Sequence, residues 1–507
     1  MDWKTRSFQR SEQLLSVCSS RQHGSHLSGR AGLTFTVDDF ERTIHDVQQY
    51  GGAIMKDVGE TDFGNSGFNS GTANDSAIGS QGSSGPFALT RDPCQIGLTQ
   101  GGSMATLKMK HGVISADDHV QEAPDVWTKR MSKAKFGDEI PHIVDLPDGS
   151  QTWALGGNSK GFGGLARISG VKAKVRTWDE VPRSTYVAAE RLKILDQEEV
   201  DASVLFPNII GITNQNFQKE GSEEFRLACI QAYNDWLIEE WQDYSPRFIA
   251  QCVAPMWDVK LCVAEIHRAV KRGHKALVWH GAPHILGLKY FNDPYWHPVF
   301  QACCDLDVPL CLHSTAVPSL PAWASLQGGA RIALSVSMTF VSHMEIVSNI
   351  LYSGVFEQFP KLKTISVESG VGWLPYLLEE LDHEFEERRV AKSTTLTKKP
   401  SETFRSNMWS TFWHERHGIR SRDEIGVDKI MYSTDYPHGT TTWPKSVWCR
   451  THSLQDVVSV DDRRKILMDN AIGLYKLDVD KSRINQPLYE PGPITVGPQP
   501  EAAKPGV

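Results

Sequence analysis

The amino-acid sequence predicts an α/β protein with a (β/α)8 barrel, the TIM-barrel architecture. Eight short apolar runs, each rich in β-branched or aromatic residues, alternate with longer amphipathic stretches between residues 113 and 475. This alternation is typical of parallel strand–helix units, and eight such units close a barrel. A doubly wound sheet is the competing fold, but no G-x-G-x-x-G segment follows the first apolar run. The barrel is therefore the favoured architecture.

The apolar runs define the expected strands. They span residues 113–116, 200–206, 248–254, 276–279, 308–312, 362–367, 408–413 and 430–433. In three of the intervening stretches, residues 226–241, 259–273 and 373–389, apolar residues recur at intervals of three and four with charged residues opposite. That spacing predicts helices that each bury one face against the strands.

The barrel is expected to occupy residues 104–475. This is longer than the roughly 250 residues of a typical barrel. The excess lies mainly in residues 123–184, which form an insertion between the first strand and the first helix. Within it, the segment HIVDLPDGSQTWAL predicts a β-hairpin that turns at Asp148-Gly149.

Both ends of the chain differ in composition from the barrel. Residues 1–103 are expected to be a poorly ordered extension with one short helix at 36–50, because residues 59–86 are rich in Gly and Ser and offer little to bury. Met104 precedes the first periodic segment, so a chain starting there is expected to contain the whole barrel. Residues 476–507 are Pro-rich and are expected to be a tail that is draped over the surface or disordered.

Composition excludes several classes of function. With 53 basic and 61 acidic residues the formal net charge is −8, and no block of basic residues is long enough to bind nucleic acid. No run approaches the roughly 18 apolar residues that a membrane span needs. The nine cysteines are scattered and form no C-x-x-C, which favours reduced thiols and a cytoplasmic location. The serine-rich, basic first 32 residues leave import into an organelle as the alternative.

Acidic and histidine side chains follow four of the eight predicted strands. Because the carboxyl ends of parallel barrel strands meet at one rim, we expect these side chains to lie together. Asp117 and His119 are two apart in a strand and therefore point the same way. The full set is Asp117, His119, His313, Glu368, Asp435 and His438.

Two imidazoles and two or three carboxylates suit one divalent ion at an open site, with zinc expected and manganese or iron possible. Each residue also has an ordinary structural interpretation: Asp117 and Asp435 could cap helices, and Glu368 could pair with an arginine. His438 could equally well cap a helix or line the pocket. Their joint occurrence at strand ends favours the metal site.

Several segments resemble, in the same order, the amidohydrolase-related family that includes aminocarboxymuconate semialdehyde decarboxylase and aromatic-acid decarboxylases. The most specific are GVFEQFPKLKTISVESGVGWLPYLLEELD and IMYSTDYPH, and the resemblance covers roughly residues 113–475. It implies a metal-dependent barrel enzyme. The family's ligand positions match Asp117, His119, His313 and Asp435 in this sequence.

The sequence departs from the family pattern at two positions. Many members have His-x-His on the first strand where this chain has Asp117-x-His119. Many also carry an acid–base histidine after the sixth strand, where this chain has Glu368. The fourth strand ends at Trp279-His280 without a lysine, so the carbamylated-lysine bridge of two-metal relatives is not expected.

The resemblance implies a non-oxidative decarboxylase of a small aromatic or unsaturated carboxylic acid, with Glu368 or His438 as the proton donor. The alternative is a metal-dependent hydrolase of an ester, lactone or amide, in which Asp435 or Glu368 accepts a proton from water. A metal-binding but inactive module is the remote alternative, because the sixth-strand histidine is replaced. The expected partner is a small-molecule substrate, and a homo-oligomer is possible.

Overall fold

The computed structural model of the protein describes residues 105–500, except for residues 158–174, 212–216, 218 and 314–324. The predicted helix at 36–50 and the Gly/Ser-rich segment at 59–86 lie outside the described residues.

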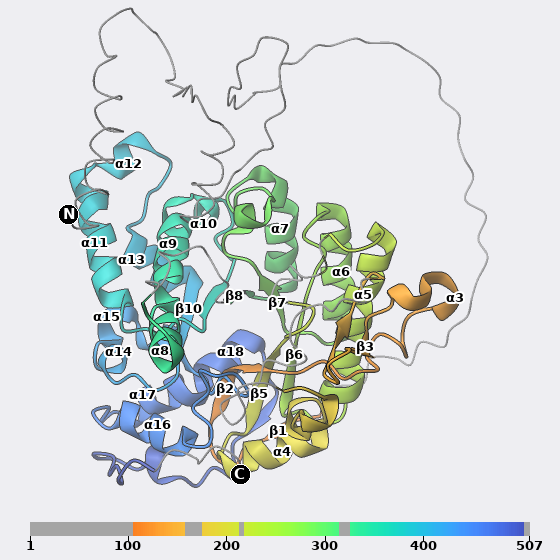
Figure 1. The fold of residues 1–507 in the computed structure, drawn as a ribbon. Helices are drawn as coiled ribbons and strands as arrows, with labels where there is room; N and C mark the ends of the chain where they lie inside the picture. The colour runs from red at the N-terminus through yellow and green to blue at the C-terminus, as the bar shows by residue number, and fades with distance from the viewer. Residues whose placement is uncertain (1–104, 158–174, 212–216, 218, 314–324, 501–507) are drawn as a thin grey trace, which may run out of the picture. The chain divides into compact units, whose positions relative to one another are not determined.

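One eight-stranded parallel sheet forms the centre of the described fold (Figure 1). Neighbours in the sheet follow the chain order: β2 (Ile114–His119), β5 (Ala202–Phe206), β6 (Phe248–Cys252), β7 (Ala276–Trp279), β8 (Leu310–His313), β9 (Thr364–Val367), β10 (Met408–Phe412) and β11 (Ile430–Tyr432). The last and first strands meet where Asp435 N–H donates to the Asp117 carbonyl at 2.8 Å and His119 N–H donates to the Tyr436 carbonyl at 2.7 Å. The sheet is therefore a nearly closed barrel, and the predicted fold and its eight strands are confirmed.

Helices lie around this sheet and in the segments that connect its strands. They are α3 (Lys133–Phe136), α4 (Ala188–Gln197), α5 (Glu223–Trp236), α6 (Val259–Arg272), α7 (His297–Leu306), α8 (Gly328–Ser337), α9 (Thr339–Tyr352), α10 (Val355–Gln358), α11 (Leu374–Glu387), α12 (Val390–Ser393), α13 (Pro400–Asn407), α14 (His417–Arg420), α15 (Arg422–Ile425), α16 (Ser446–Leu454), α17 (Val460–Arg464) and α18 (Asn470–Tyr475). Helix α6 illustrates how the sequence sets them. The Asp258 carboxylate caps its first turn, Cys262 and Ile266 are buried on one face, and Gly273 ends it at φ 122°. The predicted helix at 226–241 is α5 followed by a π-helical turn, Leu237–Gln242.

The first strand is longer than its apolar run predicts. It continues to His119, although residues 117–119 are charged or polar, and its register with β5 shifts between Ser115 and Asp118. This bulge turns Asp118 toward the seam between β2 and β11. Its carboxylate accepts hydrogen bonds from the Thr434 hydroxyl and from Tyr436 N–H at 3.0 Å across this seam, and from the Ser203 hydroxyl of β5.

Asp118→Ala is expected to destabilise the barrel by more than about 3 kcal/mol, because each buried donor left without an acceptor costs about 1–3 kcal/mol. Chemical denaturation of the full chain measures the change. Asp423→Ala, which removes an exposed carboxylate on α15, is the matched control and is expected to change stability little. Equal stability of the two variants would contradict a structural role for Asp118.

The insertion after β2 contains the predicted hairpin. Strands β3 (His142–Asp145) and β4 (Gln151–Ala154) pair antiparallel. Leu146 N–H donates to the Ser150 carbonyl at 2.7 Å across the turn, and Gly149 adopts φ 75°, a conformation that glycine takes without strain.

The C-terminal tail packs along the barrel over its described length. Strand β12 (Val479–Asp480) pairs in parallel with β1 (Leu107–Lys108). The Arg463 guanidinium donates to the Leu488 and Glu490 carbonyls, each at 3.0 Å, and the Tyr489 hydroxyl donates to the Gly112 carbonyl. The tail thus holds the segment that enters the first barrel strand.

A chain that begins at Met104 is expected to fold and to bind metal as the full chain does, because every described element begins at or after Leu107. Circular dichroism, thermal unfolding and metal content of the two chains make the comparison. Aggregation of the shortened chain, with the full chain staying in solution, would show that the preceding residues belong to the fold.

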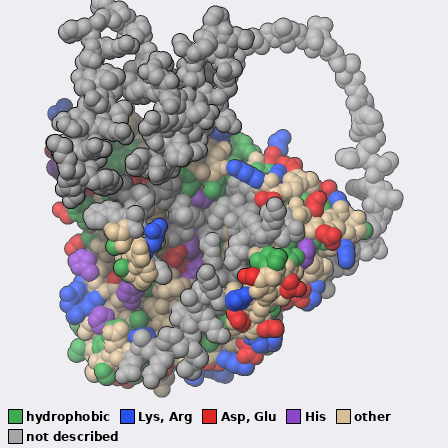
Figure 2. Space-filling view, in the orientation of Figure 1, with side chains coloured by type: hydrophobic (Ala, Val, Ile, Leu, Met, Phe, Trp, Pro, Cys, Tyr) green, Lys and Arg blue, Asp and Glu red, His purple; other side chains and the backbone are tan. Residues whose placement is uncertain are grey.

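No helix among the described residues combines the length and apolarity needed to cross a membrane. On the face drawn in Figure 2, basic and acidic side chains are interspersed.

Candidate metal centre

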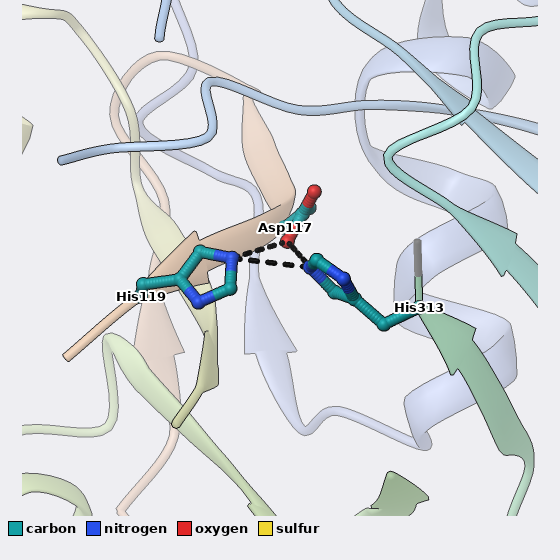
Figure 3. Close-up of side chains that lie close together, drawn as sticks. All are labelled: Asp117, His119 and His313. Atoms are coloured by element: carbon teal, nitrogen blue, oxygen red, sulfur yellow. Dashed lines mark hydrogen bonds and ion pairs between the residues drawn. The ribbon is translucent and has the colours of Figure 1, made fainter. Parts of the chain in front are cut away.

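Three strands deliver four of the predicted residues to one place. Asp117 and His119 lie at the end of β2, His313 ends β8, and Asp435 follows β11. The Nε2 atoms of His119 and His313 are 3.1 Å apart, and Asp117 Oδ1 is 3.5 Å from the first and 3.3 Å from the second (Figure 3). Asp435 Oδ1 is 3.5 Å from His119 Nε2. All four donor groups therefore converge, as the strand-end argument predicts.

The cluster is buried and its carboxylates have few protein partners. Asp117, His119 and Asp435 are 0% exposed and His313 is 1% exposed. Within the described residues, neither carboxylate oxygen of Asp117 nor Asp435 Oδ1 accepts a hydrogen bond. Buried polar atoms are nearly always satisfied, so these oxygens are suited to bind a ligand that the polypeptide does not supply. A divalent cation fits this donor set.

The electrostatics also favour a cation. Burial lowers the pKa of His119 to about 4, which leaves its imidazole neutral and able to donate a lone pair. Burial, and then the nearby carboxylates of Glu368, Asp117 and Asp118, hold the pKa of Asp435 well above its ordinary value. A bound cation would offset this repulsion between buried acids.

Partners behind the cluster orient both imidazoles. His119 Nδ1 lies 3.2 Å from the Pro207 carbonyl, and His313 Nδ1 lies 3.5 Å from Glu368 Oε2. A metal-binding histidine commonly directs its second ring nitrogen at a carbonyl or carboxylate, which fixes the ring and frees the first nitrogen. Glu368 thus contacts the far side of a predicted ligand.

Two acids of the site have unusual backbone conformations. Glu368 and Asp435 both adopt φ 55°, in the left-handed region that is rare for residues other than glycine. The Thr440 hydroxyl lies between them, bonded to Asp435 Oδ2 and 3.3 Å from Glu368 Oε1. Such conformations concentrate at functional sites, where the surrounding structure enforces them.

His438 adjoins the same cluster. Its Nδ1 is 3.1 Å from Asp435 Oδ1, its Nε2 is 2.8 Å from Asn208 Oδ1, and its ring centroid is 3.6 Å from that of His119. His119, Asp435 and His438 form a second group whose ligand atoms lie within 4.8 Å of one another. All six predicted site residues are therefore neighbours.

Sequence reasoning did not identify Asn208 and Thr440. Asn208 follows the second barrel strand closely, so the strand-end rule could have identified it. Thr440 lies in the loop after β11, and no local pattern distinguishes it. Two other buried histidines stay outside the cluster: His280 Nδ1 accepts from Ala282 N–H at 3.0 Å, and His343 Nδ1 bonds the Ser366 hydroxyl at 2.8 Å.

A parallel eight-stranded barrel with buried Asp and His donors at its strand ends defines a candidate metal-dependent barrel enzyme. A family model described as Amidohydrolase matches residues 171–477, so the chain belongs to the amidohydrolase family. The match begins after β2, so Asp117 and His119 are placed by the geometry rather than by the family model.

Two curated relatives of the chain are named as decarboxylases. The chain is 26% identical to a gamma-resorcylate decarboxylase of Polaromonas. The alignment of 313 residues covers 60% of this chain and 92% of the relative. The chain is 30% identical to the decarboxylase orsB of Emericella nidulans, in an alignment of 224 residues that covers 41% of this chain and 65% of the relative.

Solved structures have the same fold. An amidohydrolase of Mycobacterium avium superposes on this chain with a TM-score of 0.55 at 22% identity. The superposition covers 72% of this chain and 99% of the amidohydrolase chain. A 5-carboxyvanillate decarboxylase of Novosphingobium aromaticivorans, solved with manganese and a nitrobenzoic acid, has a TM-score of 0.50 at 19% identity over 74% of this chain and 100% of its own. The chain is thus a distant relative of the gamma-resorcylate decarboxylases, and it shares its fold with these solved structures.

Proposed function

We propose that this chain uses one divalent metal ion to decarboxylate a small aromatic or unsaturated carboxylic acid without oxidation. The observation that carries the proposal is the buried group of Asp and His donors at the ends of β2, β8 and β11, in a chain whose curated relatives are named as decarboxylases. The resorcylate decarboxylase match covers 92% of that relative.

Asp117, His119, His313 and Asp435 are the proposed metal ligands. When bound, the ion would act as a Lewis acid that holds the substrate carboxylate and a neighbouring oxygen and stabilises developing negative charge. Zinc is the ion expected from two imidazoles and two carboxylates. Manganese and iron are the alternatives, and the structure of the 5-carboxyvanillate decarboxylase contains manganese.

Glu368 is the proposed proton donor. The bond between the substrate carbon and its carboxyl group breaks, the electron pair remains on that carbon, and CO₂ leaves. The carbon then takes a proton from the Glu368 carboxyl group, which regains one from water. Two contacts at the edge of the ligand group support this role. Oε2 lies 3.5 Å from His313 Nδ1, behind that ring, and Oε1 lies 3.3 Å from the Thr440 hydroxyl, which also bonds Asp435 Oδ2.

The proposal is tested by metal analysis of the purified protein, followed by mass spectrometry of aromatic and heteroaromatic acids incubated with zinc-loaded and manganese-loaded protein. Loss of the mass of CO₂, dependent on the metal, is the expected result. Esters, lactones and amides are incubated in the same way, and products that together gain the mass of water would instead assign a hydrolase, with Asp435 or Glu368 as the proton acceptor. A fully loaded protein with neither activity would favour the inactive module.

A further inference from the structure

Asn208 connects the loops that follow three barrel strands. It follows β5 and is almost fully buried, at 4% exposure. Its Nδ2 donates to the Val120 carbonyl, one residue after β2, at 3.1 Å. Its Oδ1 lies 2.8 Å from His438 Nε2 in the loop after β11. The amide group therefore spans the barrel seam beside the candidate metal centre.

The partners of this amide determine which way it faces. The Val120 carbonyl can only accept a hydrogen bond, so the NH₂ group of Asn208 must face it. The amide oxygen then faces His438 and can also only accept, which requires a hydrogen on His438 Nε2. In a neutral imidazole the lone pair is then on Nδ1, which lies 3.1 Å from Asp435 Oδ1.

The position of Asn208 is itself fixed by a buried carboxylate. Glu122 accepts hydrogen bonds from the backbone N–H groups of Asn208 at 3.1 Å, Ile209 at 2.8 Å and Ile210 at 3.2 Å. Three bonds to one carboxylate hold this loop in a single geometry. The orientation of the amide therefore does not depend on a bound substrate.

We propose that Asn208 is a positioning residue that holds His438 as its Nε2–H tautomer and directs the Nδ1 lone pair at the metal-binding side chains. Nδ1 and Asp435 Oδ1 are then two acceptors at 3.1 Å, which repel unless a cation or a shared proton lies between them. This agrees with a cation at the site. It also makes His438 a hydrogen-bond acceptor on that side. Only the effect on turnover rests on the proposed function.

The tautomer can be observed directly. In the zinc-loaded full chain labelled with [¹⁵N]histidine, two-bond proton–nitrogen correlations distinguish Nε2–H from Nδ1–H, and loss of one spin system in His438→Gln assigns the signal. We expect the Nε2–H pattern in the wild type. We expect Asn208→Leu to lose this pattern. We also expect its turnover to fall about 10–100-fold, the usual effect of removing a residue that supports a metal site from outside the ligand shell.

Two further variants separate positioning from packing. Asn208→Asp keeps an acceptor and is expected to keep the Nε2 proton. Asn407→Leu removes another buried amide at the opposite end of the barrel. Asn407 precedes β10 and donates to the Pro360 and Leu362 carbonyls, which precede β9, and this variant is expected to leave the His438 pattern unchanged.

Several results would overturn the inference: a wild-type His438 protonated on Nδ1 or on both nitrogens, or an unchanged pattern in a folded Asn208→Leu variant. If the pattern changes as expected but the wild type decarboxylates no acid, the positioning role stands and the proposed function fails.

Discussion

Replacing Glu368 by Gln is expected to lower turnover by about 10²–10⁴-fold, the contribution that general acid–base catalysis usually makes, while metal content stays nearly unchanged. Gln preserves the shape of the side chain and its acceptor oxygen but cannot exchange a proton as a carboxyl group does. Metal content and turnover must be measured on the same preparation, because a lost ligand also lowers activity.

Glu379→Gln is the matched control. It makes the same change at an exposed position on α11, the helix that follows β9, and is expected to leave both quantities unchanged. If Glu368→Gln loses metal together with activity, Glu368 is a ligand rather than the proton donor. If it retains both, His438 becomes the better candidate for the proton transfer.

Removing a central ligand is expected to have a still larger effect. His119 Nε2 lies within 3.1–3.5 Å of donor atoms on His313, Asp117 and Asp435. His119→Ala therefore removes the donor atom that lies close to each of the other three. Partners outside the ligand shell typically contribute about 10–100-fold in metal affinity. A direct ligand is expected to contribute more than this, and activity should fall below detection. Titration with zinc and manganese measures the affinity.

A matched variant controls for the loss of a buried imidazole. His274 is 1% exposed, precedes β7 at the opposite end of the barrel, and bonds the Ala269 carbonyl through Nδ1 at 3.0 Å. His274→Ala is expected to lower stability as His119→Ala does, but to keep metal affinity. An unchanged metal affinity in His119→Ala would refute the proposed centre.

The strands and the rim of the barrel could be predicted from the sequence because both depend on local patterns. Apolar runs of four to seven residues bounded by polar ones mark buried strands, and the amphipathic spacing of segments such as 259–273 marks the helices between them. Parallel strands all end at the same rim, so the polar residue that ends each run is directed there. This reasoning brought Asp117, His313 and Asp435 together although they are far apart in the chain.

The tertiary structure decided how these residues relate to one another. Glu368 looks like any other strand-end acid in the sequence, but packing places it behind His313 rather than beside Asp117. Asn208 becomes a partner of His438 only because the loops after β5 and β11 meet at the seam, and Thr440 bonds Asp435 only because of how the loop after β11 folds. Strand identity follows from periodicity within a few residues, whereas a contact between two loops depends on every element that positions them.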